Sequence, residues 1–173
     1  MQTREALLER IPKGGICAEI GVLNGDFSER IIQICKPSIL WLVDVFEGNY
    51  YETNLVTSYE QLQLKYKNYY NGTEIQFFKG ESNTFFAQQW VKDYFDFIYI
   101  DADHSYQAVK QDLKNSLNAI KCNGYIGGHD YTSLEIYNFG VIQAVHELSA
   151  DYNLGFEITK EDDLPSFLFH ITK

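Results

Sequence analysis

The sequence predicts an open α/β fold: a mostly parallel sheet of seven strands, with helices on both faces and an antiparallel C-terminal strand. Two observations lead to this expectation. Short apolar runs alternate along the chain with stretches of helical spacing. The last two strand candidates are joined only by Glu161 to Pro165, which is typical of an antiparallel hairpin.

The chain begins with a helix and the first strand–turn–helix unit. Residues 3–11 have helical spacing that stops at Pro12, and an apolar strand follows at residues 16–20. A turn that contains glycine leads to a helix over about residues 26–36, which Pro37 ends. A strand followed directly by a helix is the repeating unit of a parallel sheet.

The second strand is predicted at residues 39–43, which are apolar throughout, as expected for a parallel strand buried on both faces. Residues 46–56 are rich in polar and aromatic side chains and predict a loop. A helix follows over about residues 57–69. The Asn71-Gly72 turn then precedes a strand at residues 75–78.

The third and fourth units follow the same order. Asn83 is a suitable N-cap for a helix that runs to about Tyr94. Residues 95–101 form the fourth strand, and Ser105 is a suitable N-cap for a long helix to about Lys121.

The C-terminal part supplies the end of the sheet. Gly124 leads into the fifth strand, and a last helix is expected over about residues 139–151. The two closing strands are expected at about residues 155–159 and 166–172. Together these elements form one domain over residues 1–173, since a chain of this length builds one core.

Composition and charge exclude several classes of function. The net charge is −10 and no basic stripe is present, which argues against nucleic acid as a partner. No apolar run reaches the length of a membrane span, and the N-terminus resembles no signal peptide. Cysteines 17, 35 and 122 form no Cys-x-x-Cys pair. We therefore expect a cytoplasmic protein with reduced thiols and no membrane association.

A glycine-containing turn follows the first strand, where Glu19 begins the segment Glu19-Ile20-Gly21-Val22-Leu23-Asn24-Gly25. Asp44 ends the second strand, a position where an acid commonly binds ribose hydroxyls. The turn lacks the pattern Gly-x-Gly-x-x-Gly, because Glu19 stands where its first glycine would be. An oxidoreductase that uses a nicotinamide cofactor is therefore disfavoured.

Two further segments carry the reactive side chains. Asp101-Ala102-Asp103-His104-Ser105-Tyr106 follows the fourth strand, and Gly127-Gly128-His129-Asp130-Tyr131 follows the fifth. Carboxyl ends of neighbouring parallel strands open into one crevice, so three carboxylates and two imidazoles are expected to converge. Close carboxylates repel unless a cation or a proton lies between them. The spacing predicts a reaction centre, and a metal site is one way to build it.

The turn, Asp44, the segment Gly80-Glu81-Ser82 and the two reactive segments resemble successive motifs of class I S-adenosylmethionine-dependent methyltransferases. The reactive segments are similar to those of the small-molecule O-methyltransferase branch, which includes macrocin-type and cephalosporin-cluster enzymes. The resemblance covers about residues 15–131 and implies the Rossmann-like form of the α/β fold.

The resemblance implies a set of cofactor contacts. Glu19, Gly21 and Gly25 belong to the turn that cradles the methionine part of S-adenosylmethionine. The acid at Asp44 would hold the ribose, and Ser82 would lie near the adenine.

The resemblance implies two further cofactor contacts. Asp101 would also bind the cofactor, and Phe46 or another loop aromatic would pack on the adenine.

The resemblance also implies a divalent metal, held by Asp101, His129 and Asp130. His129 departs from the pattern, since related enzymes more often carry an acid there. Imidazole with carboxylates favours Mn, Fe, Zn or Ni over Mg, which prefers oxygen ligands. The divalent metals considered for the site are Mg, Mn, Fe and Zn.

Catalysis is assigned to His104, Asp101 and His129. The metal would lower the pKa of an acceptor hydroxyl, and His104 or His129 would take its proton. A structural alternative stands beside this one: Asp103 caps the following helix and His104 is held by the backbone. Asp112 and Glu147 are interpreted as solvated charges.

The leading hypothesis is methyl transfer from S-adenosylmethionine to a hydroxyl of a small molecule, assisted by a divalent metal. A metal-independent methyltransferase with a histidine base and a nucleoside- or metabolite-binding module without turnover stay open as alternatives. A homo-oligomer is also left open, because no inserted substrate domain is evident.

Overall fold

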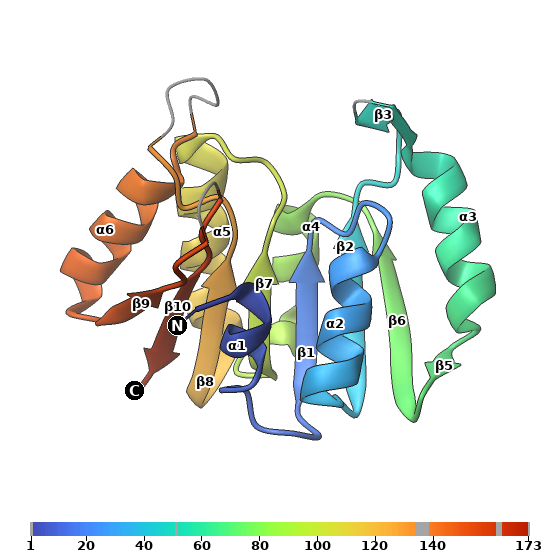
Figure 1. Ribbon diagram of the computed structural model, residues 1–173, viewed down its shortest axis with the longest axis horizontal. Coiled ribbons are helices and arrows are strands. Elements are labelled where there is room, and N and C mark those ends of the chain that lie inside the picture. Colours follow the sequence, from blue (N-terminus) through green and yellow to red (C-terminus); the bar gives the residue numbers. More distant parts are fainter. Residues whose placement is uncertain (1, 51, 134–138, 162–163, 173) are drawn as a thin grey trace.

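The computed structural model describes residues 2–50, 52–133, 139–161 and 164–172. Its centre is an eight-stranded sheet in the order β5-β6-β2-β1-β7-β8-β10-β9 (Figure 1). The strands are β1 (Ile16–Ile20), β2 (Ile39–Asp44), β5 (Tyr69–Tyr70), β6 (Thr73–Lys79), β7 (Phe95–Ile100), β8 (Ile120–Gly128), β9 (Phe156–Ile158) and β10 (Phe167–Ile171).

Helices cover both faces of this sheet (Figure 1). One face packs against α1 (Arg4–Leu8), α2 (Asp26–Cys35) and α3 (Leu55–Tyr66). The other packs against α4 (Ser82–Phe86), α5 (Tyr106–Ala119) and α6 (Val141–Tyr152). Successive strand residues alternate between the two cores: in β7, Phe97 packs with the first set and Ile98 with the second.

The strand directions confirm the predicted fold class. Strands β6, β2, β1, β7 and β8 are parallel, and β10 runs antiparallel to both β8 and β9. The chain moves outward from β1 through β2 to β6 and then returns to β7, which pairs with the other side of β1. The carboxyl ends of β1 and β7 therefore flank the point where the strand order reverses, which is where open α/β sheets bind ligands.

The sheet has eight strands instead of the predicted seven, because β5 lies at the predicted C-terminal end of helix 57–69. Helix α3 stops at Tyr66, where Lys67 adopts a left-handed conformation with φ 40°. The predicted loop 46–56 contains a short hairpin of β3 (Asn49–Tyr50) and β4 (Thr53–Asn54). Helical spacing alone did not reveal where the left-handed residue ends the helix.

The predicted helix from Asn83 to Tyr94 is wrong. Helix α4 ends at Phe86, with Glu81 at its N-cap, and a 3₁₀ turn follows at η1 (Gln89–Val91). The Phe85 and Trp90 rings pack against each other and against Trp41, so aromatic packing bends the chain back over the sheet.

The ends of the last two units also differ slightly from the prediction. Strand β8 begins at Ile120, directly after α5, rather than beyond Gly124. Within the described ranges, no helix combines the length and the apolar character that a membrane span requires.

Candidate active site

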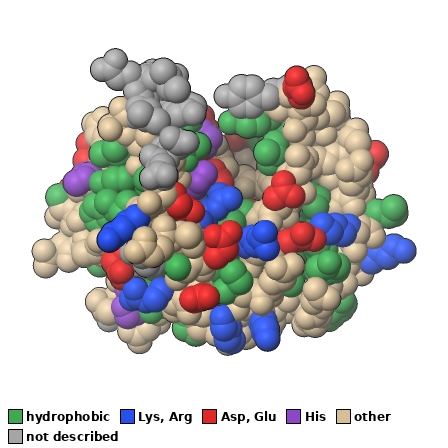
Figure 2. Space-filling model, in the orientation of Figure 1, with side chains coloured by type: hydrophobic (Ala, Val, Ile, Leu, Met, Phe, Trp, Pro, Cys, Tyr) green, Lys and Arg blue, Asp and Glu red, His purple; other side chains and the backbone are tan. Residues whose placement is uncertain are grey.

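A cavity of about 640 Å³ lies at the carboxyl ends of β1, β2 and β7. Figure 2 shows a notch at the upper edge of the molecule, with acidic and histidine side chains beside it. The cavity has the size of a small-molecule site. Of the sequence-predicted site residues, these line it: Glu19, Gly21, Asp44, Ser82, Asp101 and His104.

Gly21 is required by the contact between β1 and β7. Its φ is +88°, and a Cβ atom at this position would lie 2.0 Å from the Asp101 carbonyl oxygen. Gly25 has a φ of +75°, and a Cβ atom added there would lie 2.5 Å from Cδ2 of Leu62. Both glycines therefore have a structural reason that holds whether or not a ligand approaches the turn.

Asp44 holds the turn after β1 in place. Its Oδ2 accepts hydrogen bonds from the backbone N–H groups of Val22 (2.8 Å) and Leu23 (3.1 Å). Its Oδ1 accepts one from Phe46 N at 3.0 Å. A carboxylate offers about four lone-pair sites and three are used here, so Asp44 can still accept one hydrogen bond, for example from a ribose hydroxyl.

Glu19 lines the cavity, and it is almost completely buried. Burial raises its pKa to about 8, although the hydrogen bond from the Ser28 hydroxyl acts in the opposite direction. Glu19 is therefore mostly protonated at neutral pH. It offers a neutral carboxyl group rather than a fixed charge.

Ser82 and Asp112 form a pair in the lining of the cavity, where the Ser82 hydroxyl donates to Asp112 Oδ1 at 2.6 Å. The interpretation of Asp112 as a solvated charge is wrong, since its side chain is buried and lines the cavity. Burial raises its pKa to about 6, against the hydrogen bond from Ser82. The signal was present in the sequence, because Asp112 shares the helical stripe of Val109, Leu113 and Ser116.

Phe46 does not line the cavity. Its ring is fully buried on the α3 face, 4.6 Å from the Tyr59 ring between centroids. Val45 and Tyr50 contribute to the cavity wall in its place.

Four reactive side chains meet where β7 and β8 end. His104 Nε2 lies 2.6 Å from Asp130 Oδ2 and 3.6 Å from Asp101 Oδ1. His129 Nδ1 lies 3.2 Å from Asp130 Oδ1 and 3.7 Å from Asp101 Oδ1. The predicted convergence of the two segments is therefore present in the structure, and we call these four residues the acid–histidine cluster.

The two histidines and the two acids of this cluster balance one another's charge. Burial lowers the pKa of each histidine, but the nearby carboxylates outweigh it and raise both values to about 9. Burial raises the pKa of Asp101 and Asp130, and the histidines reverse this and hold both below their ordinary value. Protons on the histidines can thus relieve the carboxylate repulsion that suggested a metal.

The cluster also contains a donor set for a metal. Ligand atoms of Asp101, His104 and Asp130 lie within 4.8 Å of one another. Two carboxylates and one imidazole suit a first-row transition ion. This set shares both acids with the sequence-predicted one and has His104 as its histidine. Asp103 instead accepts a hydrogen bond from Ser105 N at 2.8 Å, which forms an Asx turn just before α5, while Ser105 is the N-cap residue of that helix.

Sequence reasoning also missed a charged residue of the lining. Arg4, in α1, lines the cavity and lies 3.5 Å from Asp101 between Nη1 and Oδ2. No local signal marked it, because α1 and β7 are far apart in the chain.

Comparisons with known proteins agree with this architecture. A family model described as a methyltransferase domain matches residues 18–131. None of the curated proteins compared with the chain matches it significantly.

Three solved structures illustrate the likeness of fold. The N-methyltransferase NodS from Bradyrhizobium japonicum WM9 has a TM-score of 0.65 and 14% identity, over 98% of this chain and 95% of that one. An rRNA methylase from Streptococcus thermophilus has a TM-score of 0.65 and 9% identity, over 98% and 94%. SMU.1697c from Streptococcus mutans, in complex with SAH, has a TM-score of 0.66 and 12% identity, over 98% and 99%.

Proposed function

Because the chain belongs to the methyltransferase-domain family whose model matches residues 18–131, we propose that it transfers the methyl group of S-adenosylmethionine to a hydroxyl of a small molecule. The observation that carries the proposal is one cavity that is lined both by the turn after β1 and by two members of the acid–histidine cluster, Asp101 and His104. A donor bound at the turn and an acceptor bound at the cluster would then be held in contact. Such positioning supplies a large share of the rate in a displacement between two bound molecules.

The residues of the cavity fit the cofactor in three places. Asp44 would accept a hydrogen bond from one ribose hydroxyl while its backbone contacts keep the turn fixed. Ser82 and Asp112 would meet the adenine, which carries both donors and acceptors. The turn at Gly21 would receive the methionine part, and the cofactor when bound supplies an electrophilic methyl group on its sulfonium.

The acid–histidine cluster would bind and activate the acceptor. Asp101 lines the cavity next to Gly21, so a hydroxyl bound to it would face the methionine end of the cofactor. His104 lies between Asp101 and Asp130 and can take the hydroxyl proton once it has lost its own.

A divalent metal belongs to the proposal as an aid to this step. Asp101, His104 and Asp130 would hold it, and the ion when bound would lower the pKa of the acceptor hydroxyl. The alternative without a metal is favoured by the raised histidine pKa values, since two protonated imidazoles already balance the two acids.

Calorimetry with SAH, the demethylated product, combined with Asp130→Asn tests the proposal. Asparagine is chosen because Asp130 has a φ of 56°, which asparagine tolerates better than alanine does. The wild-type chain should bind SAH, and the variant should keep that affinity within about 3-fold while methyl transfer falls by about 100-fold or more.

Failure of the wild-type chain to bind SAH would contradict the proposal. Binding of SAH with no transfer to any of a panel of hydroxyl compounds would favour a binding module instead. Transfer that survives exhaustive chelation would assign the proton to His104 without a metal.

A further inference from the structure

Arg4 is an unexpected cation in an acidic cavity. It lies in the first turn of α1, outside the residues that match the family model. The described lining of the cavity contains Arg4 as its one Lys or Arg residue. The same lining carries seven acidic residues: Glu19, Asp26, Asp44, Glu81, Asp101, Asp103 and Asp112.

The Arg4 side chain is held in position by its neighbours. Its guanidinium carbon lies 4.2 Å from the centre of the Phe27 ring, a cation–π contact with the first turn of α2. Its backbone N–H donates to Glu161 Oε1 at 2.9 Å, which fixes the start of α1. The side chain is about one quarter exposed (28%), so it is anchored but still reaches the cavity.

The ion pair between Arg4 and Asp101 is a loose one. At 3.5 Å between Nη1 and Oδ2, it is longer than a strong charge-assisted hydrogen bond, which is about 2.7–2.9 Å. Asp101 also has His104 and His129 near its other oxygen, so it does not depend on Arg4 alone. The guanidinium also interacts with the Tyr99 hydroxyl. Because it has five N–H donors, these two contacts leave donors free for a stronger acceptor.

The cofactor of the proposed function brings such a partner. Its amino-acid end carries an ammonium group and a carboxylate beside the sulfonium. An acidic cavity attracts the two cations, but it repels the carboxylate unless a positive group faces it. His104 is less suited to binding this carboxylate, because its Nε2 already lies 2.6 Å from Asp130 Oδ2.

The position of Arg4 agrees with this pairing. Arg4 contacts Asp101, whose carbonyl oxygen abuts Gly21 in the turn after β1. It therefore lies at the end of the cavity where the methionine part would bind. Ser82 follows β6, which β2 and β1 separate from β7 in the sheet.

We infer that Arg4 binds the carboxylate of the cofactor's amino-acid part, exchanging its loose contact with Asp101 for a paired contact with the ligand. The inference rests on the proposed function and assigns a specificity-determining residue within that same site. The exchange also frees Asp101 Oδ2 from its contact with Arg4, so that Asp101 can bind the acceptor.

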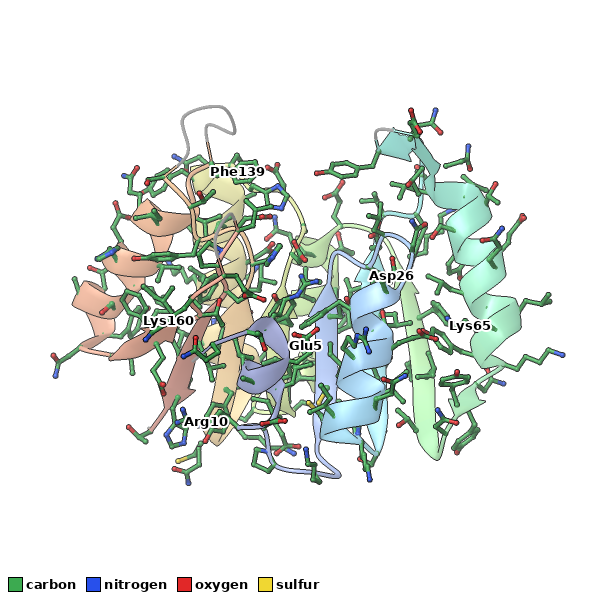
Figure 3. All side chains as sticks on the ribbon, viewed as in Figure 1. Glu5, Arg10, Asp26, Lys65, Phe139 and Lys160 are labelled. Atoms are coloured by element: carbon green, nitrogen blue, oxygen red, sulfur yellow. The ribbon has the colours of Figure 1, made fainter. Side chains whose placement is uncertain are left out.

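The test compares two ligands that differ only in the carboxylate: S-adenosylmethionine and decarboxylated S-adenosylmethionine. Affinities are measured by calorimetry for the wild-type chain, Arg4→Gln and Arg10→Gln. Arg10 is the matched control, since it follows the same helix and pairs with Glu157 at 2.8 Å outside the cavity lining. Figure 3 shows Arg10 at the lower edge of the sheet, far from Phe139 at the upper edge.

Arg4→Gln should weaken binding of S-adenosylmethionine by about 10- to 100-fold and change binding of the decarboxylated ligand by less than about 3-fold. Arg10→Gln should change neither affinity. If Arg4→Gln fails to fold, as judged by its thermal unfolding, Arg4→Lys replaces it. That variant keeps the charge without the planar fork and should show a smaller loss that is again confined to the carboxylate ligand.

Equal loss for both ligands would overturn the inference and make Arg4 a purely structural residue. The inference would also be overturned if Arg4→Gln bound both ligands as the wild-type chain does but had a raised KM for an anionic acceptor. Arg4 would then bind the acceptor. Failure of the wild-type chain to bind either ligand would instead count against the proposed function itself, and the inference would fall with it.

Discussion

Gly21 and Asp101 touch where the strand order of the sheet reverses: a Cβ atom on Gly21 would lie 2.0 Å from the Asp101 carbonyl oxygen. The contact joins the turn after β1 to the segment after β7. The two halves of the candidate site are therefore fixed relative to each other by backbone atoms rather than by flexible side chains.

Gly21→Ala should destabilise the fold strongly, because it combines a left-handed φ of +88° with a backbone clash. We expect a loss of about 3 kcal/mol or more in the free energy of unfolding, measured with urea. Gly14→Ala is the matched control, since its φ is +79° with nothing within 4 Å of the added atom. It should cost about 1–2 kcal/mol. Equal losses at the two sites would refute the close contact.

Glu19→Gln should change how stability depends on pH. The pKa of Glu19 is raised to about 8, so between its ordinary value of 4.5 and that value the folded chain keeps a proton that the unfolded chain loses. Stability therefore falls as pH rises through this window, by at most about 1.4 kcal/mol per pH unit. The free energy of unfolding is measured with urea at pH 5 and pH 8. Relative to the wild-type chain, the variant should be more stable at pH 8 than it is at pH 5. Parallel curves would show that Glu19 titrates normally.

Ser82→Ala should leave the buried Asp112 carboxylate without its donor. The loss of stability should be about 1–3 kcal/mol at pH 8. It should be smaller at pH 5, below the Asp112 pKa of about 6, where the carboxyl group is mostly protonated. Asp112→Asn supplies the control, since removing the charge should abolish this difference between the two pH values. If Ser82→Ala lost the same stability at pH 5 and at pH 8, the hydrogen bond from Ser82 would not be stabilising the charged form of Asp112.

Asp130→Asn should lower the pKa of both histidines in the cluster. NMR titration of the wild-type chain should give values of about 9, and the variant should lower them by about one unit or more. Asp151→Asn, on the exposed side of α6, should leave both titrations unchanged. Wild-type histidines that titrate near 6.5 would contradict the ion pairs.

Metal binding should compete with protons at the same cluster. A histidine must be neutral to ligate a metal, so the affinity for Mn²⁺ or Zn²⁺ should rise about tenfold per pH unit below the His104 pKa of about 9. Calorimetry at pH 6, 7 and 8 measures this slope, and Asp130→Asn should abolish binding. Absence of stoichiometric binding at pH 8 would favour the metal-independent route.

Local patterns predicted most of the fold. The apolar runs at β1, β2 and β7 and the prolines that end the neighbouring helices mark element boundaries within a few residues. They failed at α4, where the packing of Phe85 and Trp90 on Trp41 ends the helix early. Such packing joins residues about fifty positions apart and has no local signature.

The sequence by itself determined the fold class, the turn after β1 and the presence of two reactive segments at one edge of the sheet, since period and turn chemistry are local properties. Only the tertiary structure decided that His104 groups with both acids, that Asp112 lines the cavity and that Arg4 enters it from α1. Those outcomes depend on strand order and on the direction of side chains, which arise when distant segments pack together.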